Sequence, residues 1–99
     1  MDIAATPSSD GTTLTLRAGE RFDFTVQPAL RAACAGARAR CYVLDLRDTC
    51  YMDSSALGML LQLREQAGGS REAIRIRNAR PAIREILSVA NLQQLMTIE

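Results

Sequence analysis

The sequence contains no histidine, no tryptophan and no lysine, and all twelve of its basic residues are arginine. Without histidine and lysine it has no Ser–His or Cys–His nucleophile, no histidine-ligated metal, no Schiff-base or P-loop lysine, and no imidazole that changes charge near neutral pH. Aromatic residues make up 4% of the chain and the net charge is +1. These absences predict a protein that does little chemistry of its own.

Cysteine and apolar runs are also too sparse for several other classes of protein. Cys34, Cys41 and Cys50 are odd in number and form no Cys-x-x-Cys pair, so neither a disulfide framework nor a zinc site is expected, and no cofactor is predicted. No basic region precedes an apolar stretch at the start, and no run approaches the roughly 20 apolar residues of a membrane span. Near-neutral charge and few aromatics argue against nucleic-acid binding. We expect a reduced, cytoplasmic protein without direct membrane insertion.

What is present is an alternation of strand-like and helix-like segments over 99 residues, a length that holds one domain, 1–99. Thr25 is the expected N-cap of the first helix and Asp53 that of the second, which Gly68 and Gly69 end. The order predicts an α/β domain whose mixed sheet of four to five strands has helices packed on it. The predicted strands are 2–5, 12–17, 40–46 and 73–77, the predicted helices 25–34, 53–67 and 81–89, the segment 21–24 a loop, and 95–98 a last strand or a helix end.

Three acids, Asp45, Asp48 and Asp53, stand around strand 40–46, in the region where α/β sheets place their sites. An aspartyl-phosphate site would need an Asp-x-Asp pair and a lysine, and the sequence has neither. A glycosidase-like pair of carboxylates is compatible with the spacing, but a chain of this length leaves little room for a deep pocket. We therefore interpret Asp45 and Asp48 as groups that solvate the end of the strand.

The remaining glycines and arginines have structural interpretations. Gly58 fits no phosphate-binding loop and is interpreted as a point of close helix packing. The arginines between 71 and 84 are interleaved with glutamate, which is typical of a solvated face.

Helix 53–67 carries an apolar arc wider than one packed face needs, because Leu57 and Leu61 lie beside the core stripe. Two interpretations stay open: the helix is packed on two sides, or these leucines form a docking surface. Ser54 and Ser55 open the same helix. They either satisfy free amides of its first turn or include a phosphorylation site, where the helix dipole would favour a phosphate.

Residues 42–60 resemble the signature of STAS domains, specifically of the bacterial anti-sigma factor antagonists. The hallmark is an apolar strand ending in acid, a short loop, and Asp-Ser-Ser/Thr-Gly-Leu-Gly at the start of a helix; the matching residues here run Asp53-Ser54-Ser55-Ala56-Leu57-Gly58. The upstream segment 19–24 and the downstream segments 74–76 and 83–87 also fall where this family has its first loop, fourth strand and third helix. The resemblance implies a single STAS-type domain.

The same resemblance implies a small adaptor that is not itself an enzyme and is controlled by phosphorylation. Ser54 corresponds to the residue that a partner, an anti-sigma factor and serine kinase of the GHKL type, phosphorylates. The unphosphorylated form binds that partner and releases its client, and a PP2C-like phosphatase linked to a response regulator resets it. Asp23 and Asp53 correspond to acids near the phosphosite, and Ser55, Leu57 and Leu61 complete the expected partner-binding residues.

One residue departs from the family pattern, and the family also has members with another function. Ala56 stands where the family has glycine, and its methyl group would keep a partner from approaching the helix start as closely. Some STAS domains are instead constitutive subunits of lipid ABC transporters or of stress-sensing complexes, which is the alternative function.

Overall fold

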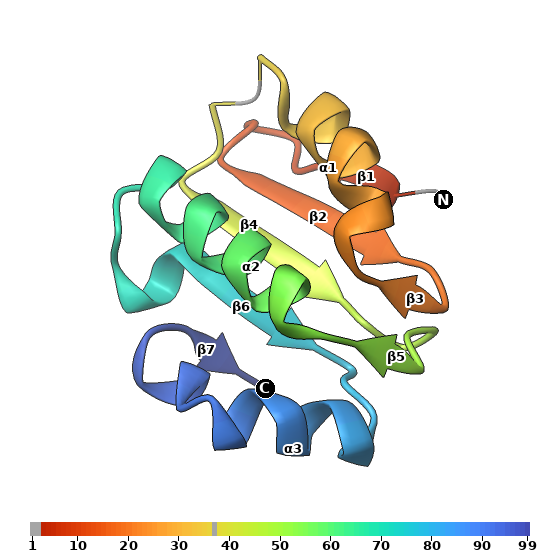
Figure 1. Ribbon diagram of the computed structural model, residues 1–99. Helices are drawn as coiled ribbons and strands as arrows, with labels where there is room; N and C mark the ends of the chain where they lie inside the picture. The colour runs from red at the N-terminus through yellow and green to blue at the C-terminus, as the bar shows by residue number, and fades with distance from the viewer. Residues whose placement is uncertain (1–2, 37) are drawn as a thin grey trace.

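A five-stranded mixed sheet forms the centre of the molecule (Figure 1). The computed structural model describes residues 3–36 and 38–99, so Asp2 of the predicted strand 2–5 lies outside the described residues. β1 runs antiparallel to β2, and the other neighbours in the sheet are parallel, in the order β1-β2-β4-β6-β7. The predicted α/β class with a mixed sheet is confirmed. The strands are β1 Ile3–Pro7, β2 Thr13–Ala18, β4 Cys41–Asp45, β6 Ile74–Arg77 and β7 Thr97–Ile98.

Three helices connect the parallel strands: α1 Gln27–Cys34, α2 Ser54–Gln66 and α3 Pro81–Val89. Each crossover moves one place along the sheet in the same direction. Because such crossovers are right-handed, the helices lie on the same face, and Figure 1 shows α1 and α2 in front of the sheet. None of the helices in the described part of the chain is long and apolar enough to cross a membrane.

The two faces of the sheet differ because side chains alternate along each strand. On the helix-covered face, Leu16, Leu44 and Ile76 are in register on adjacent strands and fully buried. Each contributes about 1.5–3 kcal/mol through burial. Thr15, Val43 and Arg75 are in register on the opposite face, which none of the described helices covers; Val43 is nonetheless buried between its two polar neighbours. The core therefore lies between the sheet and a single helical layer.

A second, two-stranded sheet corrects the predicted loop 21–24. Arg21–Phe22 forms β3, which pairs in parallel with β5, Tyr51–Met52. The backbone N–H of Tyr51 also donates to the carbonyl of Glu20 at 3.1 Å. This pairing brings the segment after β2 against the start of α2.

Short 3-10 turns complete the chain and change one predicted cap. Thr25 lies inside the turn η1, Phe24–Val26, which Asp23 caps, so Thr25 is not the N-cap of α1. Gly68 and Gly69 have φ of 106° and 79°, the left-handed conformation expected after a helix end. The last segment, 95–98, ends in strand β7. The other turns are η2 Arg71–Ala73 and η3 Leu92–Gln94.

The arginines after residue 70 are exposed as predicted, but they also hold the last residues of the chain. Arg71 donates to the carbonyl of Gln93, and Arg75 and Arg77 pair with the carboxylate of Glu99. These are surface pairs, so each adds little to stability.

Candidate functional site at the start of helix α2

Asp53 is the N-cap of α2, as predicted. Its Oδ1 accepts a hydrogen bond from the backbone N–H of Ser55 at 3.0 Å and another from the Ser55 hydroxyl. Asp23 caps η1 in the same way, through the backbone N–H of Thr25 at 3.0 Å and the Thr25 hydroxyl. The two caps share the local pattern Asp-x-Ser/Thr, which satisfies amides that a helix start leaves free.

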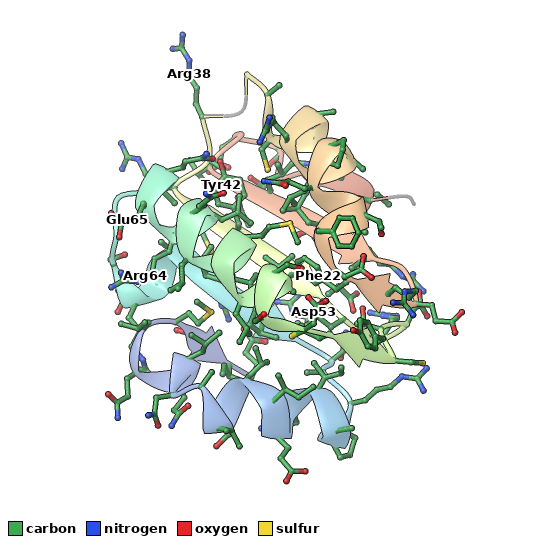
Figure 2. All side chains as sticks on the ribbon, in the orientation of Figure 1. Phe22, Arg38, Tyr42, Asp53, Arg64 and Glu65 are labelled. Atoms are coloured by element: carbon green, nitrogen blue, oxygen red, sulfur yellow. The ribbon has the colours of Figure 1, made fainter. Side chains whose placement is uncertain are left out.

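An arginine and a tyrosine connect the two capping acids. Nη2 of Arg21 lies 3.1 Å from Oδ2 of Asp23, and its guanidinium lies 4.2 Å from the ring centre of Tyr51. The Tyr51 hydroxyl donates to Oδ2 of Asp53 at 3.4 Å. Figure 2 shows Phe22 and Asp53 next to each other where β3 meets β5, which places the Asp23 loop beside α2. The structure thus joins Asp23 and Asp53, which are far apart in the sequence, in one site.

The two serines of the motif have different environments. Ser55 is half-buried and its hydroxyl is engaged by Asp53. Ser54, the first residue of α2, is exposed, and within 3–36 and 38–99 its hydroxyl makes no hydrogen bond to protein. Ser54 is therefore the hydroxyl that another protein can reach without breaking the cap.

A family model described as "Mlab, STAS domain" matches residues 5–97. The chain belongs to the STAS domain family. A curated STAS-domain containing protein of Pseudomonas aeruginosa (strain UCBPP-PA14) is 46% identical over 100 residues, covering 99% of both chains. The predicted family is confirmed.

Solved structures of anti-sigma factor antagonists have the same fold as this STAS domain. Unphosphorylated SpoIIAA superposes with a TM-score of 0.79 and 17% identity, over 98% of this chain and 87% of that one. The Bacillus cell fate determinant SpoIIAA in its phosphorylated form gives 0.70 and 18%, over 98% and 90%. An antagonist from Mycobacterium paratuberculosis gives 0.72 and 19%, over 98% and 85%.

The leucines that widen the apolar arc of α2, the helix of the STAS signature, have different environments in the structure. Leu57 is half-buried against the core, so for this side chain packing explains the arc. Leu61 is 37% exposed and remains available to a partner. Ala56 is fully buried, so its methyl group faces the core and does not narrow the surface.

Sequence reasoning missed Phe24, which is 68% exposed beside the Asp23 cap. With Gln27, Ser55, Gly58, Met59 and Gln62 it lines a shallow hollow beside α2. The available signal was a phenylalanine directly after Asp23 in a predicted loop. Phe24 and Leu61 add apolar surface near Ser54.

The acids after β4 have a structural role in this STAS domain. Asp45 is buried, which corrects its interpretation as a solvating group. Burial raises its pKa, but hydrogen bonds from Arg47 and Asn78 outweigh this and the pKa is lowered overall. Asp48 instead pairs with Arg17 at 2.9 Å. Among the described residues, no group of three or more possible ligands could hold a metal ion.

The described cysteines are free thiols. Burial raises the pKa of Cys34 and of Cys41, which disfavours the reactive thiolate.

Both capping carboxyls have lowered pKa values. The Ser55 hydroxyl bond is the main cause for Asp53, and the nearby Asp23 charge works against it. The Thr25 hydroxyl bond is the main cause for Asp23. Both groups are therefore ionised at neutral pH, and Arg21, which pairs with Asp23, offsets one of these two negative charges beside Ser54.

We expect the free energy of unfolding to fall as the pH drops below about 4. The pKa values of Asp23 and Asp53 lie below the ordinary 3.8, so the unfolded state binds protons first. Their stabilisation is complete above the unfolded pKa and is lost as pH falls through the folded pKa. Urea denaturation at about pH 3 and pH 7 measures the loss. Asp53→Asn keeps a capping acceptor and does not titrate, so its free energy of unfolding should fall less between pH 7 and pH 3 than that of the wild type. An equal fall in both proteins would contradict the role of this carboxylate.

Proposed function

We propose that this STAS domain is an anti-sigma factor antagonist whose binding is switched by phosphorylation of Ser54. The observation that carries the proposal is the exposed Ser54 hydroxyl, free of the cap that engages Ser55. In this proposal the domain acts in the cytoplasm and is not an enzyme. Similarity in fold to SpoIIAA, solved in unphosphorylated and phosphorylated forms, supports the proposal.

A phosphate on Ser54 would be compatible with the fold. The N-terminus of α2 carries the positive end of the helix dipole, which favours an anion by about 0.3–1 kcal/mol. The same phosphate adds roughly −1.5 to −2 charges. It would join the ionised Asp23 and Asp53, next to the apolar Phe24 and Leu61. A partner packed there would have to desolvate the dianion, so the cost falls on binding.

The partner in this proposal is an anti-sigma factor that is also a serine kinase of the GHKL type. It binds the unphosphorylated form around Asp23, Asp53, Ser55, Leu57 and Leu61 and releases its client. ATP and magnesium belong to this kinase. A PP2C-like phosphatase, linked to a response regulator, removes the phosphate and restores binding.

Phosphate mapping tests the proposal. We expect the serine kinase encoded nearest to this chain, with ATP and magnesium, to phosphorylate Ser54, and mass spectrometry to place the phosphate there. Ser54→Ala should abolish the modification, whereas Ser88→Ala, which changes an exposed serine of α3 outside the proposed binding residues, should retain it. Phosphate on another residue, or none, would contradict the assignment of Ser54.

The alternative is a constitutive subunit of a lipid ABC transporter or of a stress-sensing complex. The matching family model, described as an Mlab STAS domain, is compatible with this alternative. A transporter subunit would purify stably with a permease and ATPase, and its binding would not change between Ser54→Ala and Ser54→Asp.

A further inference from the structure

Gly58 is a glycine in the interior of α2 that the fold does not require. It lies on the exposed side of the helix, and a Cβ built on it would meet nothing within 4 Å beyond its chain neighbours and the backbone of the helix itself. Its backbone φ is not in the positive range where only glycine is comfortable. The interpretation of Gly58 as a point of close helix packing is therefore wrong. Glycine in a helix interior is less favourable than alanine, so the fold alone would select a larger residue here.

Gly58 lies on the same side of α2 as Ser54. Residues four apart are neighbours on a helix surface, about 5–6 Å between their Cβ positions. Both residues are exposed, and Leu61 follows on the same side. Gly58 also lines the shallow hollow between Phe24 and Gln62. A protein that covers Ser54 therefore covers Gly58 as well.

We propose that Gly58 is a contact residue for the kinase, at which a backbone segment of the kinase packs directly on α2. The inference rests on the proposed function, because phosphoryl transfer brings the kinase into contact with the Ser54 hydroxyl. Absence of a Cβ lets the two backbones approach more closely than any other residue allows. The exposed ring of Phe24 borders this approach and gives the segment an apolar surface to contact.

Gly58→Ala separates this role from folding. Alanine favours the helix, so the thermal midpoint should rise by about 4–8 °C. The added methyl group should lower kcat/KM for phosphorylation by the nearest encoded serine kinase about tenfold or more, and Gly58→Met should lower it further. Glu65→Ala and Glu65→Met are matched controls at the far end of α2 from Asp53 (Figure 2) and should leave kcat/KM unchanged.

The outcomes distinguish this inference from the proposed function. If the wild type is phosphorylated on Ser54 and Gly58→Met reacts at the wild-type rate, Gly58 is no contact residue, while the switch proposal stands. If the wild type is not phosphorylated on Ser54, the switch proposal itself fails, and this inference with it. A slow Gly58→Ala reaction together with a lowered thermal midpoint would also overturn the inference, because the loss would then reflect folding.

Discussion

Ser54→Asp is expected to lower the affinity for the anti-sigma partner by about a hundredfold, which corresponds to ~2.7 kcal/mol. The reason is desolvation of a third negative group beside Asp23 and Asp53, which are already ionised. The domain itself should fold normally, because Ser54 is exposed and the helix start favours negative charge. Isothermal titration calorimetry with the purified kinase, without ATP, measures the change.

Two matched variants give this experiment its controls. Ser54→Ala should bind like the wild type, since it adds no charge. Ser88→Asp places the same charge on an exposed serine of α3 and should also bind normally. Equal affinities of Ser54→Asp and Ser54→Ala would end the switch model.

Leu60→Ala should lower the free energy of unfolding by about 2–5 kcal/mol. Leu60 is fully buried where α2 packs on the sheet, and its loss leaves a cavity in a core with a single helical layer. Small domains have only about 5–15 kcal/mol of stability in total, so this variant should unfold at much lower urea concentration. Urea denaturation monitored by circular dichroism measures the shift.

The neighbouring Leu61→Ala is the matched control, because it removes the same atoms from an exposed side chain. We expect its stability to change by no more than about 0.5 kcal/mol. Its affinity for the kinase should nevertheless fall, since Leu61 is proposed as part of the docking surface. A large loss of stability in Leu61→Ala, or full partner binding by it, would contradict the separate roles given to these leucines.

Sequence alone predicted α2 and its cap because the signals are local. Asp53, the good helix formers after it and the glycine pair at its end all act within a few residues of the backbone they shape. The sequence also predicted Ser54 as the site residue, because Ser54 is part of the STAS signature. The alternation of strands and helices fixed the α/β class for the same reason.

The parts that sequence reasoning missed depend on contacts between distant segments. The strands β3 and β5 have two residues each, too few for any periodicity, and they exist because each pairs with the other. The buried Asp45 carboxylate has one partner nearby in the chain, Arg47, and one distant partner, Asn78, which follows the neighbouring strand β6. The open space around Gly58 depends on where α1 and η1 lie, which no local pattern encodes.

The cap of α2 has a consequence for how fast the proposed switch can be reversed. Asp53 and the Ser55 hydroxyl hold the first turn, and neither uses the Ser54 oxygen. Adding or removing a phosphate would therefore leave the backbone of this turn in place, and no step of refolding would delay the response. The kinase and the phosphatase would therefore meet the same backbone conformation with a different charge on Ser54.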